Sequence, residues 1–286
     1  MPELPEAECI RRDLERILVG QSMRLDRVER YDIVGSLTHP RGQRSGRSAA
    51  VALDELLDDC VVDCVLRKGK QIAIGAQGGR WLIIRLGMSG QMLFGRSLDA
   101  KLDHVHIRWT IDSATPLGFR DARRFGSVIP CRTRDELDAH WQKLGPDALS
   151  IESGDLLNRL RSRKTAVKAC LLDQQVVAGI GNIYADESLF RACVHPQTIA
   201  STLRREHVEL LAESVRDVMK AAIKGGGTTL RDYRSPSGAS GSYQSEHLVY
   251  GRRGEPCRTC GNTLVGKRLV GRASVWCPTC QRRRIK

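Results

Sequence analysis

The sequence has no long apolar stretch. Within its 286 residues, no apolar run approaches the roughly 18 residues of a membrane-spanning helix. The first residues also lack the cationic segment that opens a secretory signal peptide. These absences argue against a membrane-spanning function, and we expect a soluble cytoplasmic protein with no membrane partner.

Acidic residues are scarce near the C-terminal end. From residue 250 to residue 286 there are ten lysines and arginines and one acid, Glu255, in a chain whose formal net charge is +13. A basic segment of this kind is typical of proteins that bind nucleic acid. Taken alone, the three arginines at 282–284 fit a solvated basic tail equally well.

Cysteines are present, but not in the setting that favours disulfides. The ten cysteines are spread over a long chain that has no secretory signal. Cys257 and Cys260 form one C-x2-C pair, and Cys277 and Cys280 form another after sixteen intervening residues. This spacing presents four thiolates tetrahedrally to Zn²⁺, so we predict one structural Zn²⁺ and no organic cofactor. The other cysteines are expected to be small buried apolar residues.

The apolar periodicity predicts an α+β multidomain fold without internal repeats. A chain of this length usually divides, because single cores rarely grow beyond about 250 residues. An amphipathic helix is predicted at about 5–19, followed by short antiparallel strands of a sandwich or barrel and then by helices. The predicted strands are 60–66, 71–74, 81–86, 104–109 and 127–129, and the predicted helices are 164–177, 183–193 and 204–224.

The first six residues, Met1-Pro2-Glu3-Leu4-Pro5-Glu6, offer a nucleophile. Removal of Met1 would leave Pro2 as a secondary amine beside Glu3 and Glu6. An α-amino group titrates near pH ~8, so part of it is unprotonated at neutral pH, and a secondary amine forms an iminium ion with a carbonyl-type carbon. Proline and carboxylates are also common at the start of a helix. On the hexapeptide alone, an ordinary helix start is favoured over a chemical role by roughly two to one.

Gly179-Ile180-Gly181-Asn182 separates two predicted helices. Asn182 is expected at the N-cap of the second helix, and the glycines permit close approach of a phosphate to the exposed amides. By itself this turn is a weak signal, and a plain helical hairpin is the default interpretation.

Five motifs follow one another along the chain: Met1–Glu6, Leu86–Gly90, Arg123–Gly126, Gly179–Ala185 and the four cysteines. Together they resemble the formamidopyrimidine-DNA glycosylase and endonuclease VIII family, over almost the whole chain. The resemblance implies an N-terminal helix on an antiparallel β-sandwich, a helix-two-turns-helix domain and a C-terminal four-cysteine zinc-finger β-hairpin, with DNA in the cleft between the halves. The implied limits are 1–133 for the catalytic β-sandwich domain and 134–227 for the helix-two-turns-helix domain. A lesion-capping loop or linker would follow at 228–249, and the zinc finger at 250–286.

Leu4 and the Leu86–Gly90 segment resemble the branch of this family that removes oxidised purines. The resemblance implies a monomeric glycosylase and AP lyase of base excision repair, which acts on 8-oxoguanine and formamidopyrimidines in damaged double-stranded DNA. It would be of bacterial type and associated with the nucleoid while it scans DNA. Pro2 would attack C1′, Glu3 would be the general acid/base before β,δ-elimination, and Glu6 would support them or simply occupy the first helical turn.

The resemblance also implies the residues that meet DNA. An enzyme that acts on a base must extrude it and fill the gap, for which an apolar wedge and an arginine are suited. Each such residue could instead have an ordinary packing role. The expected gap-filling residues are Met88, Arg123 and Phe125; Lys70 and Arg272 are expected near the lesion, and Lys168 and Asn182 near phosphates.

Two residues depart from the family pattern. Ala122 stands where a proline commonly precedes the two arginines, and Gln71 stands where an aromatic residue commonly follows the lysine. The stretch 228–246 resembles a loop that closes over the flipped base, but it also fits an idle linker. The alternatives are an endonuclease VIII-like enzyme for oxidised pyrimidines, a non-catalytic zinc-finger DNA-binding protein and a tautomerase with a terminal proline.

Overall fold

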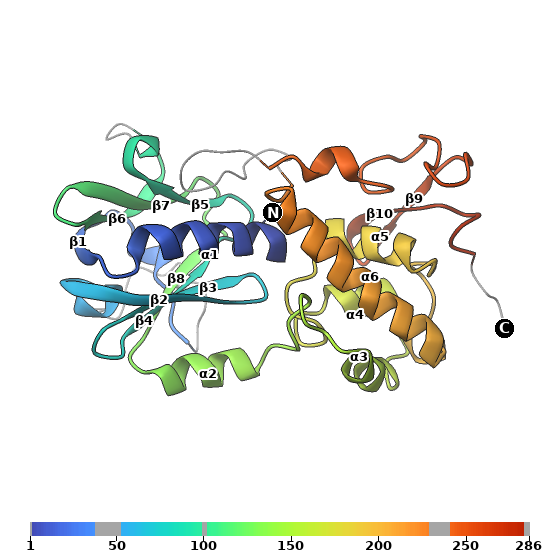
Figure 1. Cartoon of the computed structure of the whole chain (residues 1–286), viewed down its shortest axis with the longest axis horizontal. Helices are drawn as coiled ribbons and strands as arrows, with labels where there is room; N and C mark the ends of the chain where they lie inside the picture. The colour runs from blue at the N-terminus through green and yellow to red at the C-terminus, as the bar shows by residue number, and fades with distance from the viewer. Residues whose placement is uncertain (1, 38–52, 99–101, 229–240, 283–286) are drawn as a thin grey trace. The chain divides into compact units, whose positions relative to one another are not determined.

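The computed structural model describes residues 2–37, 53–98, 102–228 and 241–282, and the chain forms two compact units (Figure 1). The first unit contains Met1–Lys143 and Gly226–Ser242, and the second contains Leu144–Gly225 and Tyr243–Lys286. Among the described helices, none combines the length and the apolar character of a membrane span.

Helix α1 (Leu4–Leu18) opens the first unit. Its buried face includes Ile10 and Leu14, both 0% exposed, at the spacing of an amphipathic helix. The helix ends just before Gly20, whose φ of +81° favours glycine. The predicted helix at 5–19 is therefore confirmed to within one residue at each end.

An eight-stranded antiparallel sheet forms the body of the first unit. Its strands are β1 (Ser22–Val28), β2 (Cys60–Lys68), β3 (Gln71–Ala76), β4 (Trp81–Arg85), β5 (Gly90–Phe94), β6 (Val105–Ile111), β7 (Thr115–Asp121) and β8 (Ser127–Cys131). Their order across the sheet is β5-β7-β6-β1-β2-β3-β4-β8. The junction between β1 and β2 is short, with only the pairs Ser22–Val61 and Met23–Cys60, so the sheet consists of two four-stranded halves.

Both halves of the sheet and α1 share one apolar core. Trp109 and Phe119 enter it from β6 and β7, and Ile72 and Ile84 enter it from β3 and β4; all four are 0% exposed. Full burial of an Ile or Phe side chain stabilises a fold by about 1.5–3 kcal/mol. Helix α1 packs on β2 and β3, which gives the first functional segment a rigid support (Figure 1).

Helix α2 (Arg134–Gln142) completes this unit. The hydroxyl of Thr133 accepts a hydrogen bond from the Glu136 N–H at 3.2 Å, a typical helix start. The division between the units falls after this helix, at Lys143, beyond the limit at residue 133 that the resemblance implied.

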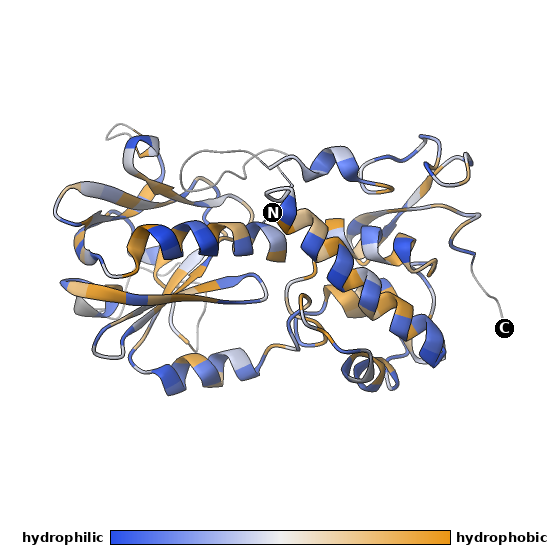
Figure 2. Ribbon diagram, viewed as in Figure 1, coloured by the Kyte–Doolittle hydropathy of each residue, from blue (hydrophilic) through white to orange (hydrophobic). Residues whose placement is uncertain are grey.

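The second unit combines helices with a two-stranded hairpin. Its elements are α3 (Ser153–Leu160), α4 (Val167–Leu172), α5 (Asn182–Arg191), α6 (Arg205–Lys224), β9 (Val265–Leu269) and β10 (Arg272–Trp276). Helix α5 contacts α4, α6 and β10, so it lies at the centre of this unit. Hydrophilic and hydrophobic residues alternate along α6, as expected for a helix with one buried face (Figure 2).

Helix α4 is shorter than the predicted helix at 164–177. The carboxylate of Asp173 accepts the N–H of Gln175 at 2.9 Å, which forms a local turn directly after the helix. Aspartate side chains compete with the helix in this way because they bond to amides two residues on. The predicted helices at 183–193 and 204–224 are confirmed as α5 and α6. The expected N-cap is wrong: Gly181 takes that position, because the Asn182 side chain bonds to the Ala273 carbonyl.

Candidate functional site

Residues Pro2, Glu3 and Glu6 lie together at the beginning of α1, and all three are buried. Glu3 is 2% exposed and Glu6 is 1% exposed. The backbone N–H of Glu3 donates to Oε2 of Glu6 at 2.8 Å, so the Glu6 carboxylate fixes the backbone that follows Pro2. Such a bond from a residue in the first turn is a standard way to satisfy an amide at a helix start.

The second oxygen of Glu6 bonds to a distant segment. Oε1 accepts the N–H of Thr228 at 2.8 Å, and Thr228 is 4% exposed. A Cβ placed on Gly241 would lie 2.2 Å from the carbonyl oxygen of Gly227, so the two ends of the 228–241 stretch touch. Glu6 therefore joins the start of α1 to the base of the expected lesion-capping loop, whose residues 229–240 lie outside the described part of the chain.

Lys70 lies in the tight turn between β2 and β3. Lys68 pairs with Gln71 across the turn, and Gly69 has a φ of +57°, as hairpin turns with glycine in the first central position require. The guanidinium of Arg67 donates to the Gly69 carbonyl at 2.9 Å and to Glu8 at 2.9 Å. The tip that carries Lys70 is thus tied to α1.

Glu8 is the common acceptor at this junction. It accepts hydrogen bonds from Arg67 and from Arg11 and Arg12 on its own helix. Burial raises the pKa of Glu8, but the hydrogen bonds from these arginines outweigh burial and hold the pKa below the ordinary 4.5. Sequence reasoning missed Glu8 and Arg67; the available signal was an acid on the helix face that also carries the buried leucines.

Gln71, which replaces the usual aromatic residue, is bound to α2. Its Oε1 accepts the indole N–H of Trp141 at 3.2 Å and lies 3.1 Å from Nε2 of His140. The departure from the family pattern is therefore matched by polar partners on α2.

The loops that contain Met88, Arg123 and Phe125 lie against each other. A Cβ on Gly87 would lie 2.4 Å from the backbone carbonyl carbon of Phe125, so only glycine allows this approach. The guanidinium carbon of Arg123 is 5.0 Å from the centroid of the Phe125 ring, and Phe125 is 38% exposed. The structure thus presents an arginine and an aromatic ring at one exposed site, with the half-buried Met88 on the adjoining loop.

In the second unit, Lys168, Asn182 and Arg272 meet at the start of β10. The side-chain amide of Asn182 donates to the Ala273 carbonyl at 2.8 Å, and Nζ of Lys168 lies 3.3 Å from the same oxygen. Arg272, the neighbour of Ala273, is exposed. Both predicted phosphate-binding residues therefore contact the segment that carries Arg272.

Lys168 is fully buried in this structure. Its ammonium lies 2.6 Å from Asp186 and donates to the Ser274 hydroxyl at 2.6 Å. Burial raises the pKa of Asp186, although the Lys168 ammonium opposes this effect. Because the ammonium has protein partners and no exposure, a direct contact between Lys168 and DNA stays a prediction.

The neighbouring Glu187 holds the other side of the finger. Its carboxylate accepts the backbone N–H groups of Leu248, Val249 and Tyr250, at 2.9, 3.0 and 2.8 Å. Sequence reasoning missed Asp186 and Glu187; adjacent acids within an otherwise apolar helix were the available signal. Asp186 accepts the backbone N–H of Val275 in β10 at 3.1 Å, so these two residues together fasten the hairpin module to α5.

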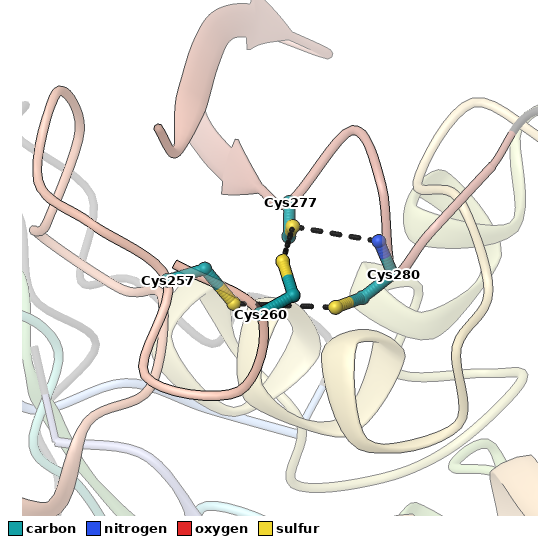
Figure 3. A group of neighbouring side chains, drawn as sticks. All are labelled: Cys257, Cys260, Cys277 and Cys280. Atoms are coloured by element: carbon teal, nitrogen blue, oxygen red, sulfur yellow. Dashed lines mark hydrogen bonds between the residues drawn. The ribbon is translucent and has the colours of Figure 1, made fainter. Parts of the chain in front are cut away.

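Cys257, Cys260, Cys277 and Cys280 converge as the spacing predicted (Figure 3). Their sulfur atoms all lie within 4.8 Å of one another, with 3.4 Å between Cys260 and Cys277 and 4.0 Å between Cys257 and Cys280. A tetrahedral zinc ion with Zn–S bonds of about 2.3 Å requires sulfur separations of about 3.8 Å. The four thiols therefore fit a structural zinc.

The cysteines outside this cluster differ in burial. Cys131 and Cys170 are buried, and Cys9, Cys60 and Cys64 are half-buried. Burial raises the pKa of the Cys131 thiol to about 12, which makes it unreactive. The prediction of burial is wrong for Cys193, which is exposed. It follows α5 with a φ of +54°, so the helix has ended before it.

Three family domains match this chain in the expected order. The formamidopyrimidine-DNA glycosylase N-terminal domain matches residues 1–128, the H2TH domain of the same enzymes matches 144–234, and the zinc finger found in FPG and IleRS matches 254–283. The formamidopyrimidine-DNA glycosylase of Thermomicrobium roseum is 39% identical over 98% of this chain and 99% of its own. The chain belongs to the formamidopyrimidine-DNA glycosylase family.

Solved structures of this family have the same fold. The MutM (Fpg) protein of Thermus thermophilus has a TM-score of 0.83 and 34% identity, over 98% of both chains. Lactococcus lactis Fpg in complex with DNA containing an abasic site has a TM-score of 0.85 and 29% identity, over 98% of this chain and 100% of that one. A variant of the same enzyme in complex with Fapy-dG DNA has a TM-score of 0.84 and 29% identity, over 99% of this chain and 100% of that one. The expected helix, antiparallel sheet, helix-two-turns-helix domain and finger are thereby confirmed.

Proposed function

We propose that this chain excises oxidised purines from double-stranded DNA and cleaves the strand at the resulting abasic site, with the amine of Pro2 as the nucleophile. As a member of the formamidopyrimidine-DNA glycosylase family, the chain is a DNA glycosylase and AP lyase. The complexes of the Lactococcus lactis relative with Fapy-dG DNA and with abasic-site DNA support the two halves of this reaction.

The observation that carries the proposal is the fixed start of α1. Pro2 stands one residue before Glu3, and the backbone that follows Pro2 is held by the Glu6 carboxylate. With Met1 removed, the proline nitrogen becomes a secondary amine on a rigid support, beside a carboxyl group that is 2% exposed. A nucleophile and an acid/base group held together in this way are what a lyase through an iminium ion requires.

The proposed reaction begins when the Pro2 nitrogen attacks C1′ of the damaged nucleotide. The bond from C1′ to the base breaks, and the base leaves with the proton that the proline nitrogen gives up. Glu3 then protonates the sugar ring oxygen as the C1′–O4′ bond opens, which leaves a positively charged iminium ion between Pro2 and C1′. This electron sink acidifies C2′. The Glu3 carboxylate takes the C2′ proton and the 3′ phosphate leaves, and a second elimination expels the 5′ phosphate.

DNA recognition is assigned to two sets of residues. Met88, Arg123 and Phe125 fill the gap left by the extruded nucleotide, and Arg123 donates to the unpaired base. Lys70 and Arg272 act near the lesion, while Asn182 and Lys168 hold the phosphate-binding segment. Contacts with phosphate fix register without reading sequence, so affinity falls steeply with salt.

The zinc in this proposal is structural. One ion bound by the four cysteine thiolates has a closed coordination shell, which leaves no position for substrate. It would hold the hairpin that presents Arg272. We further propose that the chain acts on damaged duplex DNA as a monomer in the bacterial cytoplasm.

Borohydride trapping tests the nucleophile. The untagged protein is incubated with duplexes that contain 8-oxoguanine, a formamidopyrimidine or an oxidised pyrimidine opposite each base, and borohydride is then added. We expect a covalent adduct that maps to residue 2, strongest with the oxidised purines. An adduct at a lysine, or the absence of trapping and cleavage on every duplex, overturns the role of Pro2; a preference for oxidised pyrimidines overturns the substrate assignment alone.

A blocked amine provides the matched comparison. A protein that retains Met1 or an N-terminal tag should lose base excision and still bind DNA, because its proline nitrogen is in an amide bond. Pro5→Ala changes another proline at the same helix start and should keep the trapped adduct. Full excision by the blocked protein contradicts the proposal.

A further inference from the structure

Asp121 lies between the two loops that carry the gap-filling residues. It is 0% exposed. Its Oδ1 accepts the Ser89 hydroxyl at 2.5 Å, and its Oδ2 accepts the backbone N–H of Gly126 at 2.7 Å. The N–H of Arg123 points to Oδ1 at 3.3 Å and to the Ser89 hydroxyl at 3.2 Å. One carboxylate therefore bonds to the loop of Met88 and to the loop of Arg123.

The backbone of Asp121 is itself anchored in the sheet. As the last residue of β7, it pairs with Gly90 of β5. Its N–H donates to the His104 carbonyl at 3.0 Å, and its carbonyl oxygen lies 2.8 Å from Nε2 of the buried His106. The carboxylate is consequently a fixed point to which both loops attach.

The turn between these bonds is strained. Arg124 has a φ of +54°, a conformation that costs a residue with a Cβ about 1–2 kcal/mol. Asp121 accepts the amides of Arg123, directly before Arg124, and of Gly126, two residues after it. Strain of this kind persists where the surroundings determine the conformation, and it is frequent at functional sites. With Arg124 in this conformation, the guanidinium carbon of Arg123 lies 5.0 Å from the centroid of the Phe125 ring.

The strand ends leave little freedom for adjustment. A Cβ on Gly126 would lie 2.6 Å from the Arg85 carbonyl oxygen, at the end of β4. On the other loop, Gly87 lies similarly close to the backbone of Phe125 and leaves no room for a side chain. A displacement of one loop must therefore displace the other.

We propose that Asp121 is a positioning residue for Met88, Arg123 and Phe125, and that its carboxylate presets these three side chains as one wedge before the base is extruded. This inference rests on the proposed function, in which the three residues fill the gap in the DNA. A wedge that is already ordered loses less conformational entropy on binding, so base extrusion becomes less costly. Ala122 stands where family members commonly have a proline that would stiffen this loop. Here the Asp121 carboxylate restrains the loop instead.

The test compares two reactions of one protein. Excision of 8-oxoguanine opposite cytosine requires extrusion, whereas strand cleavage at a preformed abasic site has no base to extrude. Asp121→Asn replaces one acceptor oxygen by an NH2 group. At least one of the three groups that donate to Asp121 then loses its acceptor. We expect excision to fall about 10- to 100-fold, as for lost hydrogen bonds to a charged group, and abasic cleavage to change less than about 3-fold.

A matched control changes another carboxylate of the same unit. Asp58 accepts the N–H of Leu25 in β1 at 2.8 Å and is apart from both loops in sequence. Asp58→Asn should lower the melting temperature without changing the ratio of excision to abasic cleavage. Ser89→Ala removes one donor and keeps the carboxylate, so it should lower that ratio about 3- to 10-fold.

The outcomes separate this inference from the proposed function. If folded Asp121→Asn keeps the wild-type ratio of excision to abasic cleavage, the positioning role is wrong. If that variant does not fold, an unchanged ratio in Ser89→Ala has the same meaning. If Arg123→Ala and Phe125→Ala also leave the ratio unchanged, then gap filling itself is wrong; if they lower it and Asp121→Asn does not, only the role of Asp121 fails.

Discussion

The two units present their exposed candidate residues by different physical means. In the first unit, hairpin tips and loops stand on a sheet with a large apolar core, and buried carboxylates such as Glu6 and Asp121 bond to backbone amides. In the second unit, Arg272 stands on a two-stranded hairpin whose apolar cluster is small. That cluster consists of Phe190, Val249, Leu264 and Val275 together with Cys257 and Cys277.

This difference has a physical origin. A hairpin of two five-residue strands buries too little apolar surface to fold alone. The second unit therefore adds a four-thiol cluster on one side and the buried contacts of Lys168, Asp186 and Glu187 on the other. The described loops of the first unit are attached instead to a sheet with a large apolar core, and we expect the two regions to respond differently to the same perturbation.

The largest expected effect breaks the finger alone. Cys277→Ser removes a ligand, and the zinc in a structural site contributes roughly 10–16 kcal/mol to the folding of a finger. Amide hydrogen exchange of residues 257–281 should become fast, while residues 60–131 keep their protection, and DNA binding should be lost. The exposed Cys193→Ser is the control and should match the wild type. Unchanged protection of the finger in Cys277→Ser contradicts a metal-dependent fold.

The next effect concerns the buried ion pair of the second unit. Lys168→Met leaves Asp186 buried without its cation, which should destabilise this unit by about 3–5 kcal/mol. Lys168→Met combined with Asp186→Leu should recover much of that loss, because an apolar pair needs no charge compensation. Hydrogen exchange in β9 and β10 and affinity for lesion DNA are the measurements.

Arg205→Met is the matched control for this pair. It breaks an exposed ion pair with Glu209 on α6, for which the cost should stay below about 1 kcal/mol. If Lys168→Met costs no more than this control, the buried pair does not hold the hairpin in place. A larger loss of DNA affinity than of stability would instead favour a direct contact between Lys168 and DNA.

Much of the fold could be predicted because its signals are local. The period of α1 and α6 and the two C-x2-C pairs depend on residues close in sequence. Strands β1, β5 and β7 were not predicted. Strands β5 and β7 contain Gly90, Pro116 and Gly118, which are unfavourable in strands. Their place is determined by pairing across the sheet, which no local pattern records.

The site could be predicted only in part, for a similar reason. Pro2, Glu3 and the four cysteines stand in short local motifs, so residue chemistry and the C-x2-C spacing pointed to them before the family resemblance was considered. Asp121 and Glu8 act through partners that are distant along the chain, such as Ser89 and Arg67. Their importance follows from burial and from the number of donors they satisfy. A single sequence reveals neither property.

The smallest expected effect sharpens the comparison from the side of the first unit. Glu8 has a lowered pKa in the folded protein, so its stabilising effect is complete above the ordinary value of 4.5 and is lost as the pH falls below it. Glu8→Gln should cost about 1–2 kcal/mol at neutral pH, and the gap to the wild type should close below pH 4.5. Urea unfolding followed by tryptophan fluorescence measures this, since Trp81, Trp109 and Trp141 belong to the first unit and only Trp276 to the second.

The exposed Asp63→Asn, on the same strand as Arg67, is the control and should lie close to the wild type at every pH. Protection of the finger should not change in Glu8→Gln, because its partners Arg11, Arg12 and Arg67 all lie in the first unit. A gap that stays constant down to pH 3 would mean that Glu8 acts by packing and not by its charge. The hairpin tip of Lys70 would then depend on the apolar core alone, and the role assigned to buried carboxylates would be restricted to Glu6 and Asp121.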